Sequence, residues 1–265
     1  MIAIPFAKLH GAENDFLLTW VQDAPEDRLP EVARRMCART TGIGADGWML
    51  VAKEGDGLST RLFNSDGSEP EMSGNGTRCA AAFAMWKAVL SGPVLSIGTG
   101  AGKKTLRLIN REDARFLFEM DMGVPSVEEL HATLHLAGCD YDATLLNVGN
   151  PQCAVFVDQL PQNWRAAAQE AESHKRFPQR SNVSFVRVID QHAIECVFYE
   201  RGAGETRSSG TGSTGAGCAA ILRKKAESPL EIRTPAGSMS LRWGDSVYLT
   251  GPAEVIGEGR FYLDY

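Results

Sequence analysis

Two short stretches, EMSGNGTRC at 71–79 and ETRSSGTGST at 205–214, indicate how this chain folds. Each places a Ser-Gly-x-Gly core after an acidic residue and continues into a run of small residues. Glycine allows a tight turn and a close approach of the backbone to a ligand, and serine is a preferred residue at the start of a helix. Each stretch therefore predicts a corner where a helix begins, and the N–H groups of its first turn suit an anion.

The two corners belong to an internal repeat, because Ser73 and Ser209 are 136 positions apart and other polar residues share this offset. The pairs that it relates are Ser73 and Ser209, Asn64 and Glu200, Asn14 and Asn150, and Asp46 and Asn182. Four pairs in register predict two similar halves, 1–128 and 129–265, that face each other about a pseudo-twofold axis. Coincidence in a glycine-rich sequence is the alternative. Ligand sites often lie in clefts between domains, so we expect both corners to serve one site.

The composition is that of a globular protein and excludes several classes of function. Of the 265 residues, 43% are hydrophobic and 23% are charged, and the net charge of −6 argues against nucleic acid as a partner. No apolar run approaches the roughly 20 residues that span a bilayer. The stretch 1–16 lacks the basic head and apolar core of a signal peptide, which predicts a cytoplasmic protein.

The cysteines and histidines show no metal-binding pattern. The six cysteines are scattered without a CxxC pair, and we expect them to be free and mostly buried. His131 and His135 have a spacing that can bind a metal on a helix, but no companion acid lies nearby. The sequence therefore predicts no metal site.

Short β-like runs outnumber helical ones. The expected strands lie at 16–21, 48–52, 60–64, 95–99, 105–109, 115–120, 154–157, 183–189, 192–199, 239–243 and 246–251. The expected helices lie at 28–40, 75–90, 159–172 and 213–226. Many strands with a few long helices predict an α+β fold, and the repeat predicts that it has two pseudo-symmetric α/β halves.

Two such corners around one small molecule suit a particular reaction. A carboxylate fits them better than a polyphosphate, because neither GxxxxGK[ST] nor a GxGxxG opening a βαβ unit occurs. A stereocentre beside that carboxylate can lose its proton from one face and regain it from the other, which requires an acid/base group on each side. The simpler alternative is that Ser73 and Ser209 only cap their helices.

These motifs resemble those of the diaminopimelate epimerase family, cofactor-independent amino-acid epimerases. The matching stretches run over nearly the whole chain: HGAENDF (10–16), TGIGADG (41–47), FNSDGSEPEMSGNGTRC (63–79), NVGNPQC (147–153) and ERGAGETRSSGTGS (200–213). The resemblance implies two α/β halves, each with strands wrapped around a central helix. It also implies a homodimeric isomerase that interconverts LL- and meso-diaminopimelate, in lysine and peptidoglycan precursor synthesis, without a cofactor.

The resemblance further implies roles for individual residues. Ser73 and Ser209 stand at the two acid/base positions, and Glu200 tunes one of these groups or acts beside them. Binding of the small-molecule substrate is implied for the side chains of Asn14, Asn64, Asn150, Asn182, Glu200 and Arg201 and for the backbone amides of Gly74, Asn75, Gly210 and Thr211.

The chain departs from the family at the positions that carry the chemistry. The family has a cysteine where this chain has Ser73 and Ser209, and a histidine where it has Gln152. A cysteine titrates near 8.5 and lower at a helix N-terminus, whereas a serine hydroxyl stays protonated without a strong adjacent base. Each lost acid/base group costs about 10²–10⁴-fold in rate. Cys79 and Cys218 lie more than a helical turn further on, and we expect them in the core.

Three interpretations follow. The first is an isomerase of a small amino acid, with diaminopimelate as the default substrate; it includes a one-base isomerase or dehydratase that uses Glu200 or Asp66. His10 is the only histidine of the matched motifs that could serve a serine as base. The second is a catalytically silent relative that binds an amino acid. The third is an active enzyme whose cysteines were deliberately replaced, which leaves Gln152 unexplained.

Overall fold

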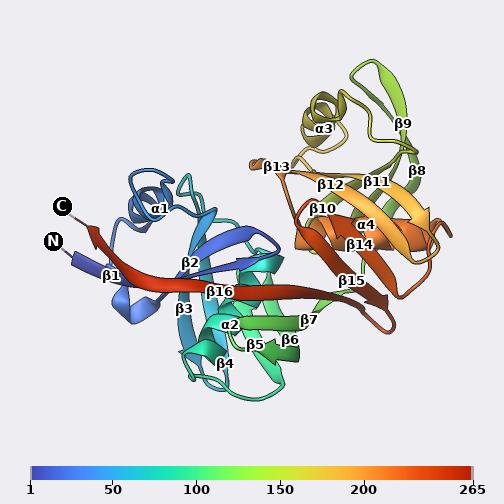
Figure 1. The fold of residues 1–265 in the computed structure, drawn as a ribbon. Coiled ribbons are helices and arrows are strands. Elements are labelled where there is room, and N and C mark those ends of the chain that lie inside the picture. Colours follow the sequence, from blue (N-terminus) through green and yellow to red (C-terminus); the bar gives the residue numbers. More distant parts are fainter. Residues whose placement is uncertain (1, 264–265) are drawn as a thin grey trace. The chain divides into compact units, whose positions relative to one another are not determined.

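The structure, a computed structural model, describes residues 2–263 and confirms the α+β class. The chain forms two compact units, and Figure 1 colours it from the N-terminus to the C-terminus. Unit 1 holds the described residues up to Met120 together with those from Gly251 onward, and unit 2 holds Asp121–Thr250. The boundary between residues 128 and 129 stays a prediction about the two sequence halves.

Unit 1 is a ring of strands around one helix. Its strands are β1 (Ile2–Gly11), β2 (Asn14–Trp20), β3 (Gly47–Glu54), β4 (Gly57–Asn64), β5 (Val94–Thr99), β6 (Gly102–Glu112) and most of β7 (Arg115–Gly123) and β16 (Val247–Leu263). Neighbours in the sheet follow chain order from β1 to β7, and β16 pairs with β1 and closes the ring. The enclosed helix is α2 (Gly74–Trp86), which is buried from Gly74 to Met85.

The sequence of α2 explains its central place. Ser73 caps the helix in an extended conformation, and its hydroxyl accepts a hydrogen bond from the N–H of Gly76. Glycine and alanine are frequent along the helix, so β1, β2 and β5 can pack closely against it. Gly11 on β1 shows how closely, because a Cβ there would lie 3.1 Å from the carbonyl oxygen of Asn75.

Helix α1 (Leu29–Cys37) packs against β3 and β4, and a short 3-10 turn (Val21–Asp23) precedes it. It has a proline in its first turn, which suits a helix start. Two successive residues of β3 pack against different helices. Trp48 belongs to the buried cluster that contains Met36 of α1, and the end of the Met49 side chain lies beside Gly76 of α2. Both faces of β3 are therefore buried, which explains its continuous apolar run.

Unit 2 repeats this plan around α4 (Gly210–Leu222). Its other elements are β8 (Ser126–Leu136), β9 (Cys139–Asn147), β10 (Pro151–Phe156), α3 (Trp164–Glu172), β11 (Asn182–Asp190), β12 (Ala193–Glu200), β13 (Gly204–Thr206), β14 (Leu230–Thr234), β15 (Gly237–Trp243) and the first residues of β16. Helix α4 contacts β9, β10, β11, β12, β14 and β15, whereas α3 contacts β8, β11 and β12. The arrangement again places one helix among the strands and one helix against them.

The structure confirms the repeat. After the offset of 136 positions, β4 and α2 have the same bounds as β12 and α4, and the bounds of α1 and α3 differ by one residue. The pairing directions also agree: β2–β3 and β10–β11 are parallel, whereas β3–β4 and β11–β12 are antiparallel. Every expected strand and helix is present, with shifted ends.

Five strands escaped the sequence prediction: β1, β8, β9, β13 and β14. Pro5 interrupts the pattern of β1, and the first six residues of β8 are mostly polar and are exposed or half-buried. Because His131 and His135 lie on β8, the helical spacing considered for a metal site does not apply. His131 instead contacts Arg223, and His135 pairs with Asp140.

Candidate active site

The predicted corner of unit 1 is a capped helix start. Ser73 Oγ accepts a hydrogen bond from the N–H of Gly76 at 3.1 Å, and its carbonyl oxygen accepts one from the N–H of Thr77 at 2.8 Å. Gly74 and Asn75 are the first two residues of α2, and both are buried. The first-turn N–H groups carry the positive end of the helix dipole, so this part of unit 1 suits a carboxylate.

The corner of unit 2 has the same geometry. Ser209 Oγ accepts from the N–H of Gly212 at 3.0 Å, and the Ser209 carbonyl accepts from the N–H of Ser213 at 2.9 Å. Gly210 and Thr211 take the places of Gly74 and Asn75. Helix α4 therefore begins three residues earlier than the expected 213, because the serine cap compensates for glycines that disfavour helix.

A cavity of about 70 Å³ lies against Ser73, with Met49, Glu71 and Thr77 in its lining. Pockets for small ligands usually measure about 300–1,000 Å³, so this cavity is too small for an amino acid. It has room for water beside the residues that line it.

Asn14 lies beside the first turn of α2. The Asn75 amide donates to Asn14 Oδ1 at 3.3 Å, and the Asn14 amide donates to Asp46 Oδ2 at 2.7 Å. The β1–β2 turn, the loop before β3 and the start of α2 are thus joined by side chains. Asn14 and Asn75 are two of the predicted site residues that the structure brings into contact.

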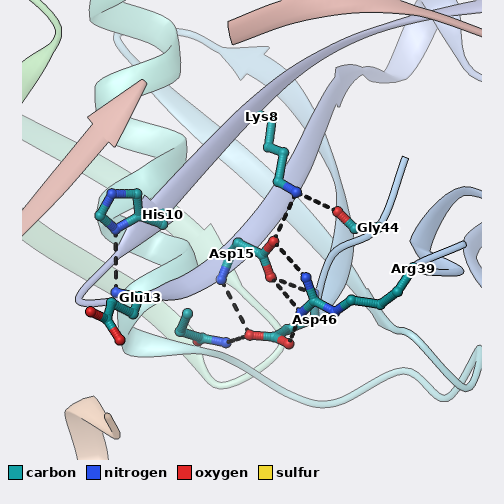
Figure 2. A network of polar contacts seen from close by, with 8 residues as sticks. Lys8, His10, Glu13, Asp15, Arg39, Gly44 and Asp46 are labelled. Atoms are coloured by element: carbon teal, nitrogen blue, oxygen red, sulfur yellow. Dashed lines mark hydrogen bonds and ion pairs between the residues drawn. The ribbon is translucent and has the colours of Figure 1, made fainter. Parts of the chain in front are cut away.

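An ion-pair cluster holds Asp46 in place (Figure 2). Arg39 donates to both carboxylate oxygens of Asp15, at 3.0 and 3.1 Å, and to Asp46 Oδ1 at 2.7 Å. Lys8 contacts Asp15 at 3.0 Å and the carbonyl of Gly44 at 2.7 Å. Burial alone would raise the pKa of Asp15, but the hydrogen bonds from Arg39 and Lys8 outweigh it and lower the pKa below its usual 3.8. The carboxylate of Asp15 is therefore fixed as an anion at neutral pH.

Asn64 ends β4 and begins the loop that leads to Ser73. Its amide donates to Ser68 Oγ at 2.9 Å, and its backbone N–H donates to the Ser68 carbonyl at 2.8 Å. Ser68 also donates to Asp66 Oδ1 at 2.6 Å. The side chain of Asn64 thus closes this loop, and its predicted role in substrate binding stays a prediction.

In unit 2, Asn150 takes the place of Asn14. Its amide donates to Thr211 Oγ1 at 3.3 Å, so the predicted residues Asn150 and Thr211 are also in contact. Gln152 donates to Asn150 Oδ1 at 2.6 Å and packs against Gly215 of α4. The side-chain oxygen of Gln152, Oε1, is buried and has no hydrogen-bond partner among residues 2–263.

Asn182, Glu200 and Arg201 lie near the ends of β11 and β12. Asn182 donates to the carbonyl of Pro151 at 3.0 Å and accepts from the N–H of Arg201 at 3.1 Å. The Arg201 guanidinium donates to the carbonyl of Gln179 at 3.2 Å, and Glu200 accepts from Thr206 at 3.1 Å. Asn182 and Arg201 are thus brought together. The side-chain nitrogen and oxygen of Asn182 both form hydrogen bonds with backbone groups.

Sequence reasoning missed Glu172, whose carboxylate fixes the turn that carries Arg201. Glu172 is only 1% exposed. It accepts from Arg180 and, at 3.2 Å, from the N–H of Gly202. Nothing in the stretch around Glu172 indicates this, because it reads as an ordinary polar helix end. A buried carboxylate with several donors is visible only in the structure.

Arg78 was also missed, although it lies inside a quoted motif. Its side chain is fully buried, and burial lowers its pKa to about 10, so it remains a cation at neutral pH. It donates to Asn75 Oδ1 and, at 3.1 Å, to the carbonyl of Pro252. Basic residues on helices usually face solvent, which is why the motif gave no signal for Arg78.

Within residues 2–263, Cys79, Cys218, His10 and Asp66 form no hydrogen bond with Ser73 or Ser209. Cys79 and Cys218 are buried, as expected, and burial raises the pKa of each thiol to about 12. His10 accepts from the N–H of Glu13 at 3.2 Å and lies 3.9 Å from Glu254. Hydrogen bonds from Ser68 lower the pKa of Asp66, which makes it a weaker base. Over the described part of the chain, neither Ser73 nor Ser209 forms a hydrogen bond with a carboxylate or an imidazole.

All six cysteines are free, and only Cys139 is exposed. No described helix has both the length and the apolar character that crossing a bilayer requires. Within residues 2–263, histidine, cysteine, aspartate and glutamate side chains form no group of three or more that could hold a metal ion.

Comparisons with known proteins give one family over nearly the whole chain. The family model described as diaminopimelate epimerase matches residues 6–128 and 144–256. A diaminopimelate epimerase of Moorella thermoacetica is 36% identical over 278 residues, which cover 98% of this chain and 99% of that protein. One from Acaryochloris marina is 37% identical and covers 97% of this chain and 98% of that protein.

Solved structures share the fold at low identity. A hydroxyproline epimerase from Agrobacterium vitis, with bound trans-4-OH-L-proline, has a TM-score of 0.77 at 16% identity over 100% of this chain and 94% of its own. A methylitaconate-delta-isomerase has a TM-score of 0.67 at 14% identity over 97% of this chain and 95% of its own. These likenesses show the fold alone, whereas the sequence relatives identify the family. The chain belongs to the diaminopimelate epimerase family.

Proposed function

We propose that this protein is an isomerase that interconverts LL- and meso-diaminopimelate by removing and returning the proton of an α-carbon. The observation that carries the proposal is the recurrence of one corner in a chain of this family. Ser73 and Ser209 each cap a buried helix start through a hydrogen bond of 3.0–3.1 Å to the N–H three residues on. Such starts suit the carboxylate next to the reacting carbon.

The amide groups of the corners supply the electrostatic part of the reaction. When the α-proton leaves, negative charge moves onto the carboxylate oxygens. We assign their binding to the N–H groups of Gly74, Asn75, Gly210 and Thr211, which are fixed by helix geometry before the substrate arrives. Donors that are preorganised in this way commonly provide the largest share of catalysis.

The proton transfers are assigned to Glu200, Ser73 and Ser209. At neutral pH a carboxylate can accept the α-proton, whereas a serine hydroxyl can donate one. In the proposed step Glu200 takes the proton from carbon and a serine returns one to the opposite face. The alkoxide that forms is neutralised by water, and Glu200 releases its proton to solvent. Because serine is a far weaker acid than cysteine, we expect slow turnover.

The remaining side chains are assigned to the rest of the substrate. We propose that Asn14, Asn64, Asn150, Asn182 and Arg201 bind its amino and distal carboxylate groups. The free cysteines fit a reducing compartment, so we also propose a cytoplasmic location. A homodimer is proposed from the family resemblance alone, and sedimentation velocity at micromolar concentration tests it.

A second candidate is a relative that binds an amino acid without turning it over. The specific observation in its favour is that, in the described residues, neither serine is hydrogen-bonded to a base that could activate it. A binding protein needs the amide-lined corners and the asparagines but not the acid/base groups. A one-base isomerase that uses Glu200 is intermediate between the two candidates, because it removes and returns a proton on only one face of the reacting carbon.

Proton–deuterium exchange separates these candidates. The protein is incubated with LL- or meso-diaminopimelate in D₂O, and NMR follows the α-proton signal and the isomer ratio. Exchange with inversion supports the epimerase, and exchange without inversion supports the one-base enzyme. Binding by calorimetry with no exchange above the buffer rate supports the silent relative and refutes the epimerase.

A further inference from the structure

A directed chain of hydrogen bonds runs through the corner of unit 1. It begins at Arg78, which donates to Asn75 Oδ1. The Asn75 amide donates to Asn14 Oδ1 at 3.3 Å, and the Asn14 amide donates to Asp46 Oδ2 at 2.7 Å. The chain therefore connects a buried cation under α2 to a carboxylate in the loop before β3.

The two ends determine how both asparagine amides are turned. Arg78 has donors only, so the oxygen of Asn75 must face it and the Asn75 NH₂ group must face Asn14. Asp46 is an acceptor only, so the NH₂ group of Asn14 must face it. Both ends impose the same direction on the chain, so they select one arrangement of the two amides. One N–H of Asn14 remains outside this chain of hydrogen bonds.

The Asp46 end of the chain accepts hydrogen bonds from several donors (Figure 2). Asp46 Oδ1 accepts from Arg39 at 2.7 Å, while Oδ2 accepts from the amide of Asn14 and, at 3.2 Å, from the N–H of Asp15. Its backbone N–H donates to Asp15 Oδ1 at 3.0 Å. Each oxygen of this carboxylate thus accepts at least one hydrogen bond, whereas an asparagine here could accept with only one of its two side-chain atoms.

Unit 2 turns its equivalent asparagine the other way. The Asn150 amide nitrogen faces the helix, where it donates to Thr211, and its oxygen faces Gln152. Position 214, which corresponds to Arg78, is a threonine that donates to the carbonyl of Gly210. The two units therefore present different atoms at equivalent positions.

We propose that Asp46 and Arg78 are positioning residues that fix, from opposite ends, the orientation in which Asn14 meets the substrate. This inference rests on the proposed role of Asn14 in binding diaminopimelate. Asp46 and Arg78 need not contact the substrate themselves. They act by holding the amide of Asn14 so that its remaining N–H points to one place.

A double-mutant cycle on substrate affinity tests the proposal. In Asp46→Asn the new amide NH₂ group faces the donor of either Arg39 or Asn14, so the hydrogen bond to that residue is lost. We expect a three- to tenfold increase in the Kd for diaminopimelate, the size of one hydrogen bond. In an Asn14→Ala background the same substitution should leave Kd unchanged, because no amide remains to be oriented.

The control is Glu31→Gln, which removes a carboxylate from the exposed pair that Glu31 forms with Arg28. It should change neither Kd nor the coupling. An equal effect of Asp46→Asn with and without Asn14 would overturn the inference, because it would indicate a general structural effect. If Asn14→Ala leaves a measurable Kd unchanged, the positioning role is refuted while the epimerase proposal stands.

A second measurement needs no substrate, so a protein that fails to bind diaminopimelate still gives an answer. In the wild type, ¹⁵N–¹H spectra should show two widely separated Asn14 side-chain protons, since only one of them is hydrogen-bonded to a carboxylate. Asp46→Asn should bring the two shifts together, and Glu31→Gln should not. Unchanged Asn14 shifts in Asp46→Asn would refute the proposal, whereas loss of diaminopimelate binding in the wild type would refute only the proposed function.

Discussion

Replacing Ser73 and Ser209 with cysteine changes one atom at each helix cap and restores groups that can ionise. Each sulfur would take the place of an oxygen that accepts a backbone N–H at 3.0–3.1 Å at the positive end of a helix. Such surroundings lower a thiol pKa from about 8.5 to about 3.5–7.5. One thiolate and one thiol near neutral pH form the pair that inversion requires.

The structure also sets the cost of these substitutions. Ser73 is half-buried and borders the cavity of about 70 Å³. Ser209 is only 3% exposed, so a larger sulfur there has to be accommodated among buried neighbours. We therefore expect Ser209→Cys to lower the free energy of unfolding by about 1 kcal/mol and Ser73→Cys by less.

The rate should respond far more strongly than the stability. Each acid/base group contributes about 10²–10⁴-fold, so the double variant should exceed the wild type by at least about 10⁴-fold in the rate of inversion. Single variants should gain α-proton exchange but little inversion. The double variant should show a bell-shaped pH–rate profile, because one thiol must be deprotonated and the other protonated.

The assay is deuterium incorporation and isomer ratio in D₂O between pH 6 and 9. Ser213→Cys is the matched control, because it adds a buried thiol to the same helix one turn after the cap. It should give no gain. The reasoning is refuted if the double variant folds and binds diaminopimelate but exchanges its α-proton no faster than the wild type.

Three further predictions concern stability and reactivity. Ser209→Ala should lower the free energy of unfolding, measured in urea, by about 0.5–2 kcal/mol, because the helix loses its cap. Ser240→Ala, a substitution at an exposed position, should not lower it. Equal effects of the two substitutions would contradict the capping role. Because the folded pKa of Asp15 lies below 3.8, its ionised form stabilises the fold fully above about pH 5, and this contribution is lost as the pH falls through 3.8 and then through the folded pKa. Urea midpoints should therefore fall more steeply toward pH 2 in the wild type than in Asp15→Asn, and parallel curves would refute this. Ellman's reagent should label Cys139 first, because Cys139 is exposed, whereas burial raises the pKa of Cys79, Cys153 and Cys218 to about 12. Mass spectrometry identifies the labelled cysteine. Labelling of one of the three buried cysteines before Cys139 would contradict the described burial.

The corners were predictable because their information is local. Ser-Gly-x-Gly fixes a cap and a tight approach within four residues, and the structure has both helix starts where the motifs place them. The repeat was also visible, since residues at one offset occupy equivalent elements. In contrast, β8 was missed because its polar residues follow no clear period and its partner β9 was not recognised either.

The supporting residues were not predictable, because their partners are distant in the sequence. Arg39 meets Asp15 across 24 positions, and Arg78 meets the carbonyl of Pro252 across 174. A sequence gives the identity of such residues but not their pairing. Asp46 shows the difference: the repeat singled it out, but only the structure shows that its carboxylate holds Asn14.

The long strand β16 has a consequence for synthesis of the chain. Strand β1 leaves the ribosome well before residues 254–263, which pair with it. During translation β1 exposes unpaired N–H and C=O groups, a template for association between nascent chains. A product that stops at Thr250 would keep this open edge permanently, so premature termination should yield aggregates rather than a stable unit 1.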